Sequence, residues 1–233
     1  MPKIPYLRNE KIEAASLCLL AEYGRKYREI VSAPVPVEEI LEAHLGLALE
    51  FDDLPRRLRV SDALGATWFK ARRVVIEESL DPTGDATKEG RYRFTLAHEI
   101  GHWELHRRFF LDDPSQTTLF EEDGKPAIVC RTGSRKDPME WQADTFSGYL
   151  LMPSGMVRRA WEAHTGGPTP YLAEEEMKNL TAKWGQGADS QPTVEIAKVL
   201  ARDFRVSGQA MQIRLIGLGL IRTERPEPDL FNV

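Results

Sequence analysis

The clearest chemical signal in the sequence is a pair of histidines four residues apart, with a glutamate directly after the first. The segment reads His98-Glu99-Ile100-Gly101-His102. At 3.6 residues per helical turn, residues four apart share one face, so both imidazoles can reach one metal ion. Glu99 lies to the side of that face and can contact a water molecule without being a ligand. This arrangement is typical of metalloproteases.

Two histidines on a helix can also be ordinary core residues that are satisfied by hydrogen bonds. His98 and His102 share a face with Phe94 and Leu105, so both imidazoles should point toward the interior. An unpartnered polar group there costs about 1–3 kcal/mol, and one metal ion would satisfy both rings. We therefore favour a metal site, with zinc as the expected ion and manganese as the alternative.

A catalytic zinc site needs a third protein ligand, and a second helix supplies the candidate. The helix expected to open at Asp137-Pro138 carries Glu140 and Asp144 on one face. We expect Glu140 to bind the metal and Asp144 to orient a ligand histidine. The alternative for Glu140 is a capping box with Asp137. Close approach to the histidine helix is favoured by three small residues, Ala143, Ser147 and Gly148.

Other polar residues near this motif are predicted to have lesser roles. His106 is eight residues from His98, about 12 Å along a helix, which is too far for one shared ion. We expect His106 to be a helix-end cation or a residue at the fringe of the cleft. A second donor for an oxyanion is also needed, and the candidates are Tyr149 and Tyr92.

The periodicity of apolar residues predicts the elements that position these side chains. Helices are expected at residues 9–28, 37–44, 88–105 and 137–152, and short apolar runs at 47–51, 63–69 and 74–76 predict a small sheet. The fold class is therefore α+β, with helices and a small, mostly antiparallel sheet. Residues 110–136 are expected to form a loop excursion with a hairpin at Asp123-Gly124. An extended substrate is expected to pair with the strand at 66–69 or at 74–77.

The C-terminal part of the chain predicts a small helical unit. Helices are expected at 155–163 and 171–184, and two more at 194–201 and 210–218 are joined by a tight turn with Ser207 as cap, a helix-turn-helix-like pattern. The polar residues that could contact bases on the last helix are few, namely Gln209, Gln212 and Arg214. We therefore favour a scaffold or substrate-docking role over DNA binding.

These elements predict four consecutive regions. The catalytic domain covers residues 1–165, a helix and polar linker 166–192, the helix-turn-helix-like unit 193–225, and a tail 226–233. The linker at 185–192 is the clearest boundary.

At these motifs the sequence resembles the ImmA/IrrE family of zincin-like metallopeptidases. The resemblance rests on residues 93–102 with His106 after them, on 140–146 and on 150–153, and it covers about residues 30–222. It implies a zincin-like domain in a peptidase that cleaves a helix-turn-helix repressor and thereby derepresses stress or mobile-element genes. Some relatives are instead paired with toxin or antitoxin genes. The long stretch at 110–136 departs from the simplest members of the family.

The metal chemistry assigns Glu99 the role of general base, which takes a proton from water and passes it to the leaving amine. The main alternative is a DNA-binding or antitoxin-like regulator with a structural or idle metal site. A third hypothesis is a peptidase for small peptides without a protein partner. The substrate, the cleavage site and the oligomeric state are left open.

Composition limits these alternatives further. The chain has 233 residues, 42% hydrophobic and 29% charged, with a net charge of −5, which excludes disordered and fibrous classes and disfavours a whole-chain nucleic-acid binder. Apolar runs are too short to span a membrane, and no secretory signal is visible, so a cytoplasmic protein is expected. Cys18 and Cys130 are too few for a disulfide scaffold.

Overall fold

A computed structural model describes residues 4–111, 126, 128–131, 137–184 and 192–223. The chain divides into two compact units, Met1–Pro153 and Ser154–Val233. The first unit ends earlier than the predicted limit at residue 165, so helix 154–165 belongs to the second unit. The predicted hairpin at Asp123-Gly124 lies outside the described residues. Within the described part of the chain, no helix combines the length and apolarity that crossing a membrane requires.

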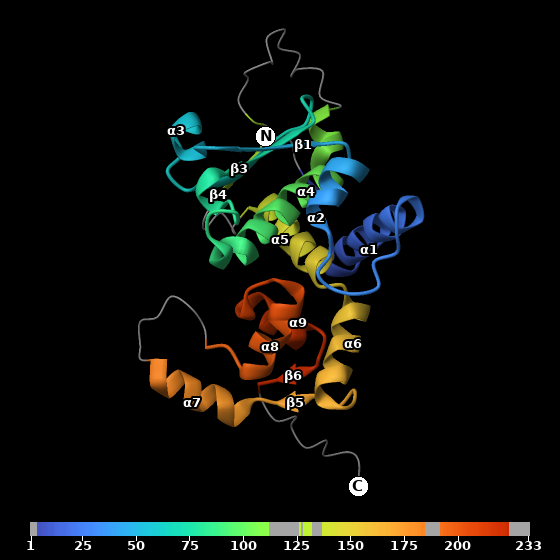
Figure 1. The fold of residues 1–233 in the computed structure, drawn as a ribbon, viewed down its shortest axis with the longest axis vertical. Coiled ribbons are helices and arrows are strands. Elements are labelled where there is room, and N and C mark those ends of the chain that lie inside the picture. The colour runs from blue at the N-terminus through green and yellow to red at the C-terminus, as the bar shows by residue number, and fades with distance from the viewer. Residues whose placement is uncertain (1–3, 112–125, 127, 132–136, 185–191, 224–233) are drawn as a thin grey trace. The chain divides into compact units, whose positions relative to one another are not determined.

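The first unit combines helices with one small sheet (Figure 1). Its α-helices are α1 (Asn9–Lys26), α2 (Val37–Glu39), α3 (Leu54–Leu58), α4 (Glu89–Leu111) and α5 (Pro138–Leu151). Helix α2 continues as a π-helical turn, Ile40–His44, and two 3₁₀ turns are Glu78–Leu80 and Ala86–Lys88. The predicted helices are therefore confirmed, and α4 is longer than expected because its apolar contacts continue: Phe110 stacks on Phe69 with ring centroids 4.9 Å apart.

The sheet contains four described strands in the order β1-β3-β2-β4. These strands are β1 (Ala48–Asp52), β2 (Ala63–Trp68), β3 (Arg73–Glu77) and β4 (Ile128–Arg131). β1 pairs with β3 in parallel, whereas β2 pairs antiparallel with both β3 and β4. The sheet is therefore mixed and mostly antiparallel, and the α+β class is confirmed.

Helices α4 and α5 pack against each other, and α4 also lies against β2 and β3 (Figure 1). Their closest approach is at Gly101: a Cβ atom there would lie 3.2 Å from the Cα and the carbonyl oxygen of Ala143. A side chain at this position would require α5 to give way by a few tenths of an ångström. The small residues thus set the spacing of the two helices at the level of the histidine pair.

Helix α5 begins as the sequence predicts. The Asp137 side chain accepts a hydrogen bond of 2.8 Å from the backbone N–H of Met139, and Pro138 occupies the first helical position. This cap fixes where α5 starts, and so fixes the positions of Glu140 and Asp144 along the helix.

The second unit contains α6 (Ser154–Thr165), α7 (Glu174–Trp184), α8 (Glu195–Phe204), α9 (Gly208–Gly217) and the short parallel pair β5 (Tyr171–Leu172) and β6 (Ile221–Arg222). The start of the predicted helix 171–184 is therefore a strand, because Tyr171 and Ala173 donate backbone hydrogen bonds to Leu220 and Arg222. Helices α8 and α9 are joined by three residues, and the Ser207 hydroxyl caps α9 by accepting from the N–H of Ala210 at 3.1 Å.

Candidate metal centre

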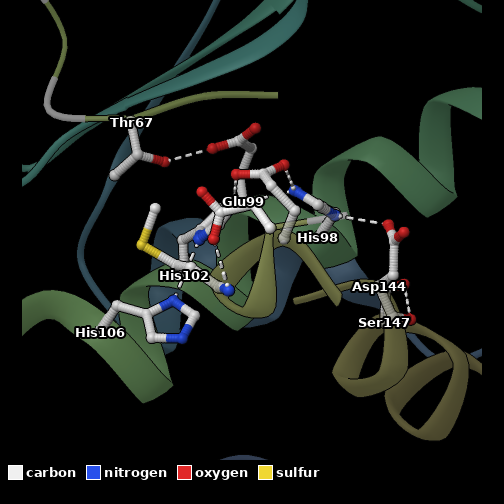
Figure 2. A network of polar contacts seen from close by, with 10 residues as sticks. Thr67, His98, Glu99, His102, His106, Asp144 and Ser147 are labelled. Carbon is white, nitrogen blue, oxygen red and sulfur yellow. Dashed lines mark hydrogen bonds and ion pairs between the residues drawn. The ribbon is translucent and has the colours of Figure 1, made fainter. Parts of the chain in front are cut away.

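The first unit brings the predicted ligands together where α4 and α5 pack against each other (Figure 2). The Nε2 atoms of His98 and His102 lie 2.9 Å apart. One carboxylate oxygen of Glu140 is 3.3 Å from His98 Nε2, and the other is 3.4 Å from His102 Nε2. All three side chains are buried, and one ligand atom from each lies within 4.8 Å of the other two. The group can hold a metal ion.

Asp144 lies one turn after Glu140 and contacts the outer nitrogen of His98. Its carboxylate oxygen is 2.9 Å from His98 Nδ1, so it accepts the Nδ1–H hydrogen bond (Figure 2). That bond leaves the Nε2 lone pair of His98 facing Glu140 and His102. The contact of Glu140 with both histidines favours its interpretation as a ligand.

Glu99 is fully buried beside this group. One carboxylate oxygen accepts a 2.6 Å hydrogen bond from the hydroxyl of Thr67 on β2 (Figure 2). The other oxygen, Oε1, has no hydrogen-bond partner in the described structure. Burial raises the pKa of Glu99 to about 7, against the lowering effects of His98 and Thr67. A carboxylate with this pKa and a free oxygen is suited to proton transfer near neutral pH.

The electrostatics of the group indicate a place for a cation. Burial lowers the pKa of His102 to about 3, so this ring is neutral. Burial opposes the charge on Glu140, yet its contacts with His102 and His98 hold its pKa well below the usual range. Burial also opposes a proton on His98, but Cys130, Asp144 and Glu140 raise its pKa well above the usual value. In the metal-free protein, a proton on His98 therefore supplies the positive charge that balances the Glu140 carboxylate.

Cys130 is a member of this neighbourhood that the sequence did not identify. It lies on β4, and its sulfur forms a second group of metal-capable atoms with His98 and Glu99. Burial raises the pKa of its thiol. The sequence analysis assigns Cys130 no role beyond excluding a disulfide scaffold, and only the pairing of β4 with β2 shows how near it lies to the histidines.

His106 was predicted to be a helix-end cation or a fringe residue, and this prediction is wrong. Helix α4 continues past it to Leu111, and the side chain is fully buried. Its Nδ1 lies 3.0 Å from His102 Nδ1, and its Nε2 lies 3.1 Å from Gln142 Oε1. Burial lowers the pKa of His106 to about 4, so the ring is neutral.

Of the tyrosines considered as oxyanion donors, Tyr92 is a core residue, whereas the role of Tyr149 stays a prediction. Tyr149 follows Glu140 by nine residues on α5, which places it about 180° around the helix axis. Tyr92 precedes His98 by six residues, is buried and stacks on Phe51 with centroids 5.7 Å apart. Its ring is a core contact.

The prediction that an extended substrate pairs with residues 66–69 or 74–77 is also wrong. The predicted segments form β2 and β3, and both are central strands with hydrogen-bonded neighbours on each side. Their backbone groups are already paired, so neither can add a further strand. Among the described strands, the edges are β1 and β4.

Comparison with known proteins identifies the family of the chain. The chain belongs to the family of the IrrE N-terminal-like domain (Peptidase M78), whose model matches residues 57–215. The family resemblance of the sequence motifs is thereby confirmed, and with it a metallopeptidase-like fold. No curated protein sequence matches the chain.

One similar solved structure is a Mycobacterium tuberculosis transcriptional regulator, with 17% sequence identity and a TM-score of 0.46. The match covers 95% of this chain and 60% of that one. This chain therefore spans less than two thirds of that protein.

Proposed function

We propose that this protein is a zinc-dependent endopeptidase that cleaves a helix-turn-helix transcriptional repressor and so derepresses stress or mobile-element genes. The observation that carries the proposal is the unpartnered Oε1 of Glu99, fully buried beside His98, His102 and Glu140. Burying a carboxylate oxygen without a partner is costly, and a site that only holds a metal does not need it. A water molecule to be deprotonated accounts for it.

Each residue of the site has a role in this chemistry. His98, His102 and Glu140 would hold the zinc ion, and Asp144 would orient His98 through its Nδ1–H. A zinc ion held there supplies Lewis acidity, which brings the pKa of water near neutrality and polarises a carbonyl group. Glu99 would accept a proton at Oε1 from water as the water oxygen bonds to the peptide carbonyl carbon, and would pass it to the amine released when the C–N bond breaks. Thr67 keeps the carboxylate in one orientation.

The edge strand β4 is the expected docking place for an extended substrate. Among the described strands it is an edge of the sheet, and its Cys130 lies in one group with His98 and Glu99. A peptide that added to this edge by backbone hydrogen bonds would pass close to the metal ligands. We therefore propose that an extended substrate pairs with β4, and not with β2 or β3 as the sequence predicted.

The C-terminal helices favour a protein partner over DNA. Gln212, one of the few residues considered for reading bases, is buried, accepts from the N–H of Val194 at 2.7 Å and donates to the carbonyl of Pro192 at 3.0 Å. The exposed face of α9 instead carries Ile213 and Ile216. We therefore assign α9 to substrate docking, and keep the DNA-binding regulator as the alternative.

The test compares wild type with Glu99→Gln and Glu140→Ala. We expect zinc near one ion per chain in wild type and in Glu99→Gln, and a large loss in Glu140→Ala, measured by elemental analysis. Helix-turn-helix repressors from the same genome, incubated with zinc-loaded protein, should be cut by wild type alone, as detected by mass spectrometry. Cleavage by Glu99→Gln at the wild-type rate would refute the peptidase. Zinc binding with no cleavage of any repressor, together with specific DNA binding, would favour the regulator.

A further inference from the structure

The outer nitrogen of His102 is held by a chain of three hydrogen bonds that ends at the N-terminal segment. From this chain we infer that His106 and Gln142 are positioning residues, which fix the tautomer of His102 so that its Nε2 lone pair faces the metal position. The inference rests on the proposed metal site. It concerns residues that neither the family match nor the ligand group assigns.

The chain of hydrogen bonds has a single direction because it ends at a backbone carbonyl. The amide nitrogen of Gln142 donates to the carbonyl oxygen of Pro5 at 2.9 Å. A carbonyl oxygen can only accept, so the opposite amide orientation would place two oxygens at that distance. The Oε1 atom of Gln142 must therefore face His106.

The orientation of Gln142 determines the protonation of both histidines. Gln142 Oε1 accepts, so His106 Nε2, 3.1 Å away, carries a hydrogen. His106 is buried and its two ring nitrogens contact an amide and an imidazole, so the neutral form is favoured and Nδ1 is an acceptor. His102 Nδ1, 3.0 Å from that acceptor, then carries the hydrogen, and His102 Nε2 keeps its lone pair.

The two proposed ligand histidines are thus oriented by different hydrogen-bond partners. His98 donates its Nδ1–H to a carboxylate, Asp144, whose side chain is 30% exposed. His102 donates to a neutral and buried chain that ends at Pro5. This N-terminal segment is anchored on α5, where Tyr6 stacks on Trp141 with centroids 5.6 Å apart. Pro5 lies before the residues matched by the family model, so a segment outside that match completes the shell around the metal site.

The test combines zinc affinity with a direct measurement of the tautomers in the full chain. Four variants are compared with wild type: Gln142→Leu, His106→Leu, His106→Asn and Ser147→Ala. The two leucine variants remove the chain of hydrogen bonds at similar volume, whereas the asparagine variant would still offer His102 an acceptor oxygen. Ser147 is the matched control, because it is buried on α5 but donates only to the backbone carbonyl of Asp144 at 2.7 Å. Zinc affinity is measured by competition with a chelator, and tautomers of the metal-free protein by ¹⁵N NMR of the imidazoles.

In metal-free wild type, we expect the imidazole hydrogen of His102 to lie on Nδ1 and that of His106 to lie on Nε2. Both leucine variants should bind zinc about 10–100-fold more weakly, since loss of such outer contacts has that effect on metal affinity. Gln142→Leu should also show a second tautomer at His102, while His106→Asn and Ser147→Ala should stay close to wild type.

Three results would overturn the inference. One is a hydrogen on Nε2 of His102 in wild type. Another is unchanged zinc affinity in folded Gln142→Leu. The third is a loss in His106→Asn equal to that in His106→Leu. A wild-type chain that binds no zinc would instead refute the proposed metal site, and the NMR measurement would still decide how the tautomers are set.

Discussion

Replacing Gly65 by alanine tests whether the position of Glu99 matters for the reaction. Gly65 lies on β2, and a Cβ atom there would be 2.5 Å from Oε1 of Glu99 and 3.0 Å from Cγ2 of Thr95. Ordinary carbon–oxygen contacts lie at roughly 3.3–3.6 Å, so the carboxylate must move by about 0.8–1.1 Å. A misplacement of about 1 Å in a reacting group costs on the order of 100-fold in rate.

The same change should spare the fold and the metal. Gly65 is not among the glycines with positive φ, and the closest atom belongs to the end of a side chain, so the backbone accepts alanine. The ligands on α4 and α5 are not the atoms that the added methyl group meets. We expect repressor cleavage by Gly65→Ala to fall about 100-fold, while zinc content and the midpoint of urea unfolding stay near wild type.

Cleavage kinetics at saturating zinc are the assay, and Gly148→Ala is the control. Gly148 lies on α5, and a Cβ atom there would meet nothing within 4 Å. That variant should keep full activity. Activity of Gly65→Ala within a few-fold of wild type would refute the role of Glu99 placement, and a parallel loss of zinc would show that the damage lies in the metal site instead.

Three further predictions concern protons and outer contacts. Thr67→Val removes a hydrogen bond that lowers the pKa of Glu99. Because Glu99 acts only when ionised, the acidic limb of the profile of kcat/KM against pH should move to higher pH by about one unit. An acidic limb that does not move would contradict this prediction. Because the pKa of His98 is raised well above 6.5 and metal binding displaces its proton, zinc affinity should rise about tenfold per pH unit below that pKa. A chelator competition at several pH values measures it, and a flat profile would argue against His98 as a ligand. Asp144→Ala should weaken zinc binding about 10–100-fold in the same competition, and an unchanged affinity would remove Asp144 from the site.

Helical spacing explains why the sequence predicts the residues that the structure brings together as a candidate ligand group. His98 and His102 share a face by their separation of four residues, and so do Glu140 and Asp144. The small residues on α5 predict that it lies close to α4, and the contact between Gly101 and Ala143 confirms this. Local rules therefore suffice for two helices and the contact between them.

Residues contributed by distant segments could not be predicted in this way. Thr67 is a single hydroxyl within an apolar strand, and nothing in its spacing relates it to Glu99. Gln142 lies beside the predicted ligands, but its role depends on the carbonyl of Pro5, 137 residues earlier in the chain. His106 was misjudged because the helix was expected to end near it, whereas packing of Phe110 on Phe69 extends α4.

The order of the strands in the sheet follows from how deeply each strand is buried. β2 and β3 are buried along nearly their whole length, as near-continuous apolar runs predict for strands covered on both faces. Such strands occupy the centre of a sheet, where no hydrogen-bonding edge is left for a substrate. β1, in contrast, has no buried residue and exposes Phe51, which fits a place at the edge of the sheet. The burial pattern thus assigns the centre of the sheet to β2 and β3, and the contact of Cys130 with the site then selects β4 over β1 as the edge nearest the candidate metal.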